Sequence, residues 1–505
     1  MTERASFVLN REDIPAAQSI MLKLATLGYS ERLVGNRLGL KDLTDLQWRA
    51  SPVYRSERLS NRDPLALAID LFLLQGSLPG NELGQLFSQS ECETFRRCGL
   101  LEVDDTGRTR ARASLFPAGT RLIFSDHAWP ALPHPGYPTA PHDHVMSVGR
   151  DSRNLLNCVP RRKFSSALDL CTGSGIHALL ATRHTQHVLA VDINPRAAQC
   201  TRFNTQISGA ANLEVVVGDL FDPIGNGRFD LITANPPFVP SPLNNLTFRD
   251  GGPSGEDVQK RIVAGLPHHL APGGIAQIVT ELGERDREPL THRLREWLNG
   301  APMDIYMLRL GEHSALKYAI GHSKGDDYQD VLDSTLEWSR NLQSQGYVRM
   351  VSLLISFQWS DVRCGSPWSR IDQSPPPHRT AGAEIDAAFL SERSTRIGGW
   401  PDILHRSSLR LAGPIALLDA HVAGRDLRAK TTATLLGQAL TIKHQLDHVE
   451  REILNQVEEK GHIPAIDLLK IFHERAVHLP SVLEATRTLL RYNLVRIDGC
   501  EVSAQ

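Results

Sequence analysis

The stretch that decides the fold is FDLITANPPFVPSP, residues 229–242. Its mostly apolar first half predicts a buried strand, and this strand stops at Asn235-Pro236-Pro237-Phe238. Two successive prolines cannot continue inside a sheet, because each one lacks a ladder N–H and has a fixed φ. The strand end therefore presents an amide side chain, a rigid backbone and an aromatic ring. In an open α/β sheet this carboxyl edge is where ligands bind.

Strands and helices alternate on both sides of this stretch. Helical patterns of about two to five turns separate the apolar runs, which implies a parallel sheet covered on both faces. With right-handed crossovers the topology is a doubly wound, Rossmann-like α/β fold. Seven strands are predicted, over 166–171, 187–193, 213–219, 229–234, 273–282, 303–310 and 346–359.

The segments around this core differ in character. Three helical patterns and two alternating strands after residue 63 have the order of a winged helix, a shape that binds DNA in many proteins and serves as a docking module in others. A second, degenerate unit of this kind is predicted near the C-terminus. The predicted organisation is a helical extension over 1–62, a winged-helix-like domain over 63–127, the α/β core over 128–360, a linker over 361–380, and a mostly helical domain over 381–505.

The composition bounds the partners and the compartment. The formal net charge is −2, so no global field draws the chain to nucleic acid or to an anionic membrane, although a local basic patch stays open. The N-terminus has no apolar h-region and no run approaches 18 apolar residues, so no membrane contact is expected. Seven scattered cysteines without a CxxC pair indicate a reducing compartment. We expect a cytoplasmic protein.

One sequence feature suggests a metal site. His142-Asp143-His144 lies in a loop rich in proline and histidine, but no further His or Cys stands at a metal-ligand spacing. We therefore predict no metal, and we expect this segment to line or cover a pocket.

The first strand-to-helix turn has the residues of a ligand-binding loop. Glycines let the backbone approach a ligand, and the following helix offers free N–H groups and the positive end of its dipole. The pattern Gly173-x-Gly175-x-x-Ala178 also fits a loose dinucleotide fingerprint, which is weak by itself. The turn is Asp169-Leu170-Cys171-Thr172-Gly173-Ser174-Gly175.

Acidic residues end the next two strands. Asp192 can accept hydrogen bonds from both hydroxyls of an unphosphorylated ribose, which suits nicotinamide cofactors and S-adenosylmethionine alike. Asp219, followed by Leu220, can accept from an adenine amino group. Each Asp taken alone could instead be a helix cap or a turn residue. Three such strand ends in register favour a nucleoside-containing cofactor.

The fourth strand end distinguishes the cofactors. DLCTGSG, AVDINPRA, GDLF and NPPFVPSP, in this order and spacing, resemble the class I S-adenosylmethionine-dependent methyltransferases that carry an Asn/Asp-Pro-Pro-aromatic motif. That branch includes glutamine methyltransferases of release factors and ribosomal proteins, adenine-amino DNA methyltransferases and guanine-amino ribosomal RNA methyltransferases. FRDGGPSGEDVQKRI and LAPGG resemble the glutamine-modifying members. The resemblance covers about 140–310. Cys171 stands where many members have glycine.

The resemblance implies roles for named residues. The methionine part of S-adenosylmethionine would be held by Asp169 and by Thr172, Gly173, Ser174 and Gly175. The ribose would be bound by Asp192 with Ile193 and Asn194, and the adenine by Asp219 and Leu220. Asn235 and the Pro236 carbonyl would accept hydrogen bonds from a substrate NH₂, next to Pro237, and Phe238 would stack on its planar group.

We therefore predict a nitrogen methyltransferase whose substrate has a planar amide or amino group. Three alternatives stay open: a nicotinamide-dependent oxidoreductase, a nucleic-acid-binding or scaffold protein with a residual cofactor domain, and a small-molecule biosynthetic enzyme that uses S-adenosylmethionine, including for non-methyl transfer. The last stays open because function resides in the site and not in the fold. The sequence leaves the acceptor itself open between glutamine, a base amine and a small molecule.

Overall fold

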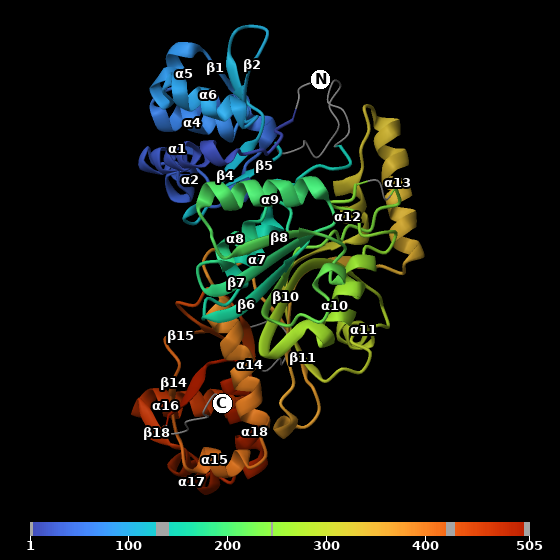
Figure 1. Ribbon diagram of the computed structural model, residues 1–505. Coiled ribbons are helices and arrows are strands. Elements are labelled where there is room, and N and C mark those ends of the chain that lie inside the picture. The colour runs from blue at the N-terminus through green and yellow to red at the C-terminus, as the bar shows by residue number, and fades with distance from the viewer. Residues whose placement is uncertain (1–3, 128–140, 244–245, 421–429, 499–505) are drawn as a thin grey trace. The chain divides into compact units, whose positions relative to one another are not determined.

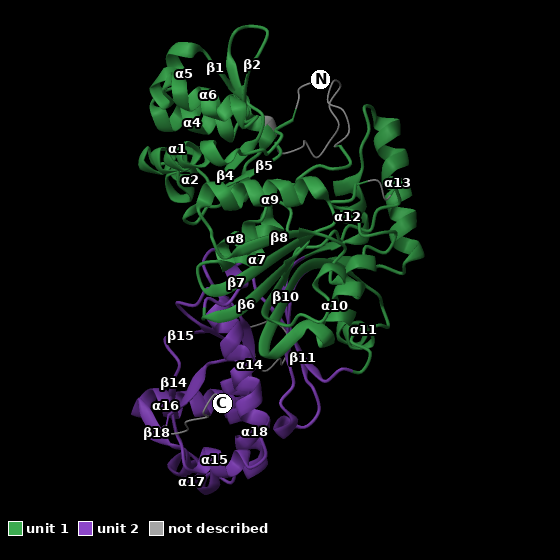
Figure 2. Ribbon diagram, viewed as in Figure 1, with its two compact units in different colours: residues 1–156, 162–300, 312–352 green, residues 157–161, 301–311, 353–505 purple. Residues whose placement is uncertain are grey.

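A computed structural model describes residues 4–127, 141–243, 246–420 and 430–498. The chain forms two compact units (Figure 2). Unit 1 comprises 1–156, 162–300 and 312–352, and unit 2 comprises 157–161, 301–311 and 353–505.

Unit 1 contains five parallel strands in the order β10-β9-β6-β7-β8. The chain adds strands outward from β6 to β8 and then returns to the other side of β6 with β9. This change of direction is the switch point at which ligands bind in such sheets. The strands are β6 (Phe164–Leu170), β7 (Thr185–Asp192), β8 (Leu213–Val217), β9 (Phe229–Ala234) and β10 (Leu270–Glu284).

Helices cross between these strands, as the alternating pattern predicts (Figure 1). Pro195 is at the first position of its helix, and the Asn194 side chain caps that helix by accepting from the Arg196 N–H at 3.0 Å. The helices of this part are α7 (Arg150–Cys158), α8 (Ile176–Ala181), α9 (Pro195–Ser208), α10 (Asp257–His269), α11 (Leu290–Trp297), α12 (Ala315–His322) and α13 (Tyr328–Ser344).

The sheet has eight strands where the sequence predicted seven. The remaining three are β11 (Met303–Ser314), β12 (Arg349–Trp359) and β13 (Ser369–Gln373). In unit 2, β11 and β13 pair in parallel, with Ile305 opposite Ser369. Strand β13 lies inside the segment predicted as a linker over 361–380. Its sequence SRIDQ contains a single apolar residue, so no alternation marks it as a strand.

The part of unit 1 before the parallel strands contains six helices and five short strands among its described residues. The three predicted helices and two strands of 63–127 are present, together with an additional strand, β1, in a sheet of order β1-β3-β2. The winged-helix assignment itself stays a prediction. The elements are α1 (Ile14–Thr26), α2 (Glu31–Leu38), α3 (Ser51–Arg58), α4 (Pro64–Phe72), α5 (Gly80–Leu86), α6 (Gln89–Arg97), β1 (Ser77–Leu78), β2 (Leu101–Val103), β3 (Thr109–Ala111), β4 (Ser114–Ala118) and β5 (Arg121–Ser125).

A single hydrophobic core joins this part to the α/β part of unit 1. It runs without interruption from Ala5 to Ile207 in α9, so the compact units do not follow the boundaries predicted at 62 and 127. Phe203 in α9 is the central contact: its ring lies 5.7 Å from that of Phe124 in β5 and 6.0 Å from that of Phe7. Residues 1–62 are thus part of the fold that carries the α/β sheet.

Unit 2 ends in a helical region that also contains two three-stranded sheets, β18-β14-β19 and β15-β16-β17. The sequence predicted its last three helices and final strand, but not the other strands. The elements are α14 (Gly382–Arg396), α15 (Trp400–His405), α16 (His448–Lys460), α17 (Ala465–Glu474), α18 (Leu479–Arg491), β14 (Ser408–Leu411), β15 (Ile415–Ala420), β16 (Lys430–Leu435), β17 (Lys443–Leu446), β18 (His462–Pro464) and β19 (Val495–Asp498).

Candidate active site

A cavity of about 320 Å³ lies at the carboxyl edge of β6, β7, β8 and β9. The ends of all four strands contribute to its lining, as the sequence predicted for a ligand site at this edge. Most of the residues that the resemblance assigned to a cofactor are there, namely Thr172, Gly173, Ser174, Asp192, Ile193, Asn194, Asp219, Leu220 and Asn235. We call it the cofactor cavity.

Two of the assigned residues do not line this cavity. Asp169 is 1% exposed, and its carboxylate accepts from the hydroxyls of Thr172 at 2.6 Å and Thr233 at 2.7 Å. It also accepts from the Ala178 N–H at 3.2 Å. Burial raises the pKa of Asp169 to about 6. Asp169 therefore sits behind the turn and fixes it from within. Gly175 contacts Thr201 instead of the cavity.

The glycines of the turn explain its shape. Gly173 has φ +59°, and a Cβ there would meet nothing within 4 Å, so open space adjoins the backbone. Gly175 has φ +83°, and a Cβ there would lie 2.7 Å from Thr201 Cγ2. Both positions require a conformation that L side chains rarely adopt. The open space at Gly173 lets a ligand approach the backbone, which fits an adenosyl cofactor.

Asp192 connects two strand ends. Its carboxylate accepts from the Gly173 N–H at 2.8 Å and from the Asn194 N–H at 2.9 Å. Burial raises its pKa above the ordinary range. A carboxylate has about four lone-pair sites, so two remain for ligand hydroxyls. The next strand end is also charged: Arg261 donates to Asp219 at 2.9 Å, and both residues line the cavity.

Two non-glycine residues at the edge are left-handed. Cys171 has φ 54° and Leu220 has φ 50°, and both line the cavity. Such backbone conformations cluster at functional sites, because the surrounding structure must hold them. At Cys171 the left-handed φ gives the physical reason why glycine is common at that position in the resembling family.

Asn204 in α9 ties the cofactor turn to the N-terminal part of unit 1. Its side chain is fully buried. The amide Nδ2 donates to the carbonyls of Ser174 at 2.9 Å and Phe124 at 2.8 Å, and Oδ1 accepts from the Phe124 N–H at 2.9 Å. A hydrogen-bonded amide of this kind fixes the distance between β5 and the turn that lines the cavity.

A second cavity, of about 470 Å³, adjoins the first at the end of β9. Asn235, Pro237, Met146 and Phe248 line both cavities. Pro236 and Phe238 line only the second one. The predicted acceptor motif thus stands where the two cavities meet. We call the second cavity the acceptor chamber.

Asn235 is held by a residue that the sequence analysis did not identify. Its Nδ2 donates to the Oγ of Ser152 in α7 at 3.1 Å. Ser152 is 5% exposed and also lines the cofactor cavity. This bond uses an N–H of the amide and leaves Oδ1 available as an acceptor. No local pattern in the sequence signals Ser152, because it reaches the site through the packing of α7.

The acceptor chamber contains further side chains that the sequence analysis missed. They come from α7, β10, β11 and α12, none of which carries a motif. The charged or titratable members are Asp151, Arg249, Glu281, His313, Lys317, Tyr318 and His322.

The segment His142-Asp143-His144 lies beside the cofactor cavity. His144 lines it, and its ring is 5.0 Å from that of Phe248. The His142 carbonyl accepts from the Thr247 hydroxyl at 2.8 Å, and Asp143 pairs with Arg4 at 2.8 Å. The predicted pocket-lining role is therefore confirmed for His144. The earlier part of that loop, 128–140, lies outside the described residues.

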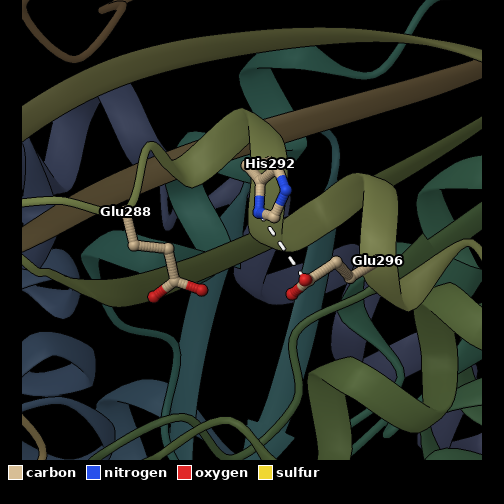
Figure 3. Close-up of side chains that lie close together, drawn as sticks. All are labelled: Glu288, His292 and Glu296. Carbon is tan, nitrogen blue, oxygen red and sulfur yellow. Dashed lines mark ion pairs between the residues drawn. The ribbon is translucent and has the colours of Figure 1, made fainter.

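One cluster of potential metal ligands occurs elsewhere in unit 1. Glu288, His292 and Glu296 point toward one another, and His292 pairs with Glu296 at 3.6 Å (Figure 3). The Glu288 carboxylate is already bound by Arg293 at 2.9 Å and by Arg285. Two guanidinium groups at the same carboxylate oppose the binding of a cation. In the ranges that the structure describes, every helix is too short or too polar to cross a bilayer.

The comparisons with known proteins agree with this site. The methyltransferase small domain family matches residues 146–298. A protein of Methanocaldococcus jannaschii, provisionally named a protein N5-glutamine methyltransferase, is 30% identical over 146 residues, which are 27% of this chain and 73% of that protein. A ribosomal protein uL3 glutamine methyltransferase of Bradyrhizobium diazoefficiens is 40% identical over 24% of this chain and 41% of its own length.

A third relative acts on a different kind of acceptor. The tRNA1(Val) (adenine(37)-N6)-methyltransferase of Porphyromonas gingivalis is 45% identical over 85 residues, which are 15% of this chain and 33% of that protein. The chain thus spans less than half the length of two of these three relatives. The matched region includes both cavities' share of β6 to β10.

Proposed function

Because the chain belongs to the methyltransferase small domain family of class I S-adenosylmethionine-dependent methyltransferases, we propose that it transfers the methyl group of S-adenosylmethionine to a planar amide or amine nitrogen. The observation that carries this proposal is the position of Asn235. It lines the cofactor cavity and the acceptor chamber together, so a group bound to it faces both.

The residues of the cofactor cavity fit the parts of S-adenosylmethionine. In the proposal, Asp192 binds the ribose hydroxyls and Asp219 with Leu220 faces the adenine. Thr172, Gly173 and Ser174 border the methionine part, while Asp169 and Gly175 shape the turn behind them. The bound cofactor supplies a methyl group that its sulfonium has already activated.

Asn235 and the Pro236 carbonyl then act on the acceptor. An amide or aryl amine nitrogen is a poor nucleophile, because its lone pair is delocalised. Two fixed acceptors, Asn235 Oδ1 and the Pro236 carbonyl, would bind its two hydrogens and turn the lone pair toward the methyl group. The N–C bond forms as the S–C bond breaks, and the nitrogen releases one proton. Catalysis would be mainly proximity and electrostatic preorganisation.

The acceptor that we propose first is a glutamine side chain of a protein. The Bradyrhizobium diazoefficiens relative is named for such an activity and the Methanocaldococcus jannaschii relative provisionally so. Components of translation that carry such glutamines would place the activity in the cytoplasm. Nothing in the proposal requires nucleic acid, consistent with the net charge of −2.

The test is methyl transfer from labelled S-adenosylmethionine into extracts of a strain that lacks the gene, followed by mass spectrometry of the labelled fraction. Label on glutamine is expected; label on a base amine or a small molecule would identify a different acceptor. Asn235→Ala should bind S-adenosylhomocysteine normally by calorimetry and lose transfer. Asn235→Asp keeps an acceptor oxygen and should retain part of it. Unchanged turnover in Asn235→Ala would contradict the proposed role.

A further inference from the structure

Two carboxyl groups of the acceptor chamber have no counter-ion. Asp151 in α7 and Glu281 in β10 both line this cavity. In the part of the chain that the structure describes, neither of them forms an ion pair. Glu281 accepts one hydrogen bond, from the Ser352 hydroxyl at 2.8 Å. The two groups therefore present negative charge to the space in front of Asn235.

A third polar group in the chamber is buried and unsatisfied. The side chain of Tyr318 in α12 is 3% exposed, and its hydroxyl has no hydrogen-bond partner among the described residues. Glu281 lies close enough that its charge adds to burial in raising the pKa of this hydroxyl well above the usual value. Leaving a buried hydroxyl unpaired costs about 1–3 kcal/mol in general, so such a group in a cavity points to a ligand.

The basic residues of the chamber do not neutralise the two carboxyls. Arg249 donates to Asp250 at 2.8 Å and lies over the Trp338 ring, 5.7 Å from its centroid. His313 and Lys317 are exposed and belong to the mouth of the chamber. His322 stacks on Tyr318 at 4.1 Å, and burial lowers its pKa, so it stays neutral near pH 7.

We propose that the acceptor chamber selects substrates whose planar amino group carries a positive charge, as an amidinium or guanidinium does, with Asp151 and Glu281 as its counter-ions and Tyr318 as a hydrogen-bond partner. Paired carboxylates match the N–H groups of such cations, and these charge-assisted bonds are stronger than neutral ones. Phe238 offers its face to the same planar cation. This inference rests on the proposed function, because it assigns the acceptor to the nitrogen site at Asn235.

The charge on Asp151 itself supports the inference. Burial, followed by the charge of Glu281, raises the pKa of Asp151 to about 7. One of the two carboxyls thus carries a proton in the free protein at slightly acidic pH. A cation between them replaces that proton, so its binding should strengthen as the pH rises through 7.

Two probes of the same shape separate charge from planarity. Benzamide and benzamidine are both flat and both carry an NH₂ group, but only benzamidine is a cation. Their binding is measured by calorimetry in the presence of S-adenosylhomocysteine at pH 6 and pH 8. We expect benzamidine to bind at least tenfold more tightly at pH 8, and with a smaller advantage at pH 6.

The variants identify the groups responsible. Glu281→Gln should remove most of the benzamidine advantage, and Asp151→Asn provides a second variant if the first fails to fold. Glu312→Gln makes the same charge change at an exposed residue next to the chamber mouth and should keep the advantage. Equal binding of the two probes to the unmodified protein, or an advantage that persists in both chamber variants, would overturn this inference alone. If neither probe binds, the planar-nitrogen site fails, and the proposed function fails with it.

Discussion

The amide Nδ2 of Asn235 donates to the Oγ of Ser152 at 3.1 Å, so a serine outside the motif decides which way the acceptor-binding amide points. An asparagine amide can be placed in two orientations, and only one directs Oδ1 at a substrate NH₂. Ser152 is therefore a positioning residue in the proposed mechanism.

Replacement of Ser152 by alanine should lower kcat. Loss of one neutral hydrogen bond is worth about 0.5–1.5 kcal/mol, which corresponds to a decrease of roughly two- to tenfold. Ser152→Thr keeps the hydroxyl and should restore most of the activity. Single-turnover methyl transfer measures the effect, and calorimetry with S-adenosylhomocysteine should show little change.

A double-mutant cycle separates this role from a general structural one. Asn235→Asp has no Nδ2, so adding Ser152→Ala to it should lower kcat by less than the same change does in the unmodified protein. Equal decreases in both backgrounds would show that Ser152 does not act through Asn235.

Local sequence features were enough to predict much of the cofactor cavity. The end of β9 follows from two prolines, the start of α9 from Asn194 and Pro195, and the turn after β6 from its glycines. Each of these depends on residues that are neighbours in the chain. The role of Asp169 differs, because the same carboxylate can face a ligand or the turn behind it, and only the tertiary structure shows which.

The acceptor chamber could not be predicted in the same way. Ser152, Glu281 and Tyr318 come from three elements that are distant in the sequence and meet only when the strands and helices of unit 1 pack. None of them stands in a pattern that differs from an ordinary helix or strand. Strand β13 was missed for a related reason, since Ile371 is its single apolar residue and is 39% exposed.

Asn204 should couple the stability of unit 1 to cofactor affinity. Asn204→Ala removes three hydrogen bonds to backbone groups of Ser174 and Phe124. Because it leaves buried backbone groups without partners, we expect a loss of about 2–4 kcal/mol in the free energy of unfolding. The released turn should also bind S-adenosylhomocysteine more weakly, by roughly tenfold.

Asn212 offers a matched control for this variant. Its Nδ2 donates to the carbonyls of Thr182 at 3.1 Å and Thr185 at 2.8 Å, and neither residue lines the cofactor cavity. Asn212→Ala should lower the urea midpoint while leaving the calorimetric affinity unchanged. If both variants lose affinity in proportion to stability, Asn204 has no specific role at the turn.

Cys171 should tolerate glycine and reject a β-branched residue. Its φ of 54° costs an L residue about 1–2 kcal/mol, which glycine avoids, while glycine adds about 0.5–1 kcal/mol of backbone entropy cost. Cys171→Gly should therefore change the free energy of unfolding by less than about 1 kcal/mol. Cys171→Val should destabilise the protein by more than that and weaken cofactor binding.

The thiol of Cys171 has no chemical role in this account. Burial raises its pKa well above the usual value, so the thiolate is not available as a nucleophile. Cys171→Gly should consequently keep both its affinity for S-adenosylhomocysteine and its methyl transfer. A large loss of transfer with normal binding would show that the sulfur itself participates.

The stability of the protein should depend on the ionisation of Asp151. Its pKa is about 7 in the folded protein, whereas an aspartate in an unfolded chain ionises near about 3.9. Between these values the folded state keeps a proton that the unfolded state releases, so this group lowers the free energy of unfolding as the pH rises from about 4 to 7. Above pH 7 the effect is complete. Asp151→Asn removes it.

We therefore expect Asp151→Asn to be more stable than the unmodified protein at pH 8, by on the order of 1–2 kcal/mol, and by less at pH 5. The shift of about three units would correspond to more, but part of the carboxyl is open to the water of the chamber, which screens its charge. Urea unfolding at the two pH values measures the difference. Asp286→Asn, at an exposed aspartate, should give the same small change at both. A gain for Asp151→Asn that is larger at pH 5 than at pH 8 has the opposite sign and would contradict the assignment.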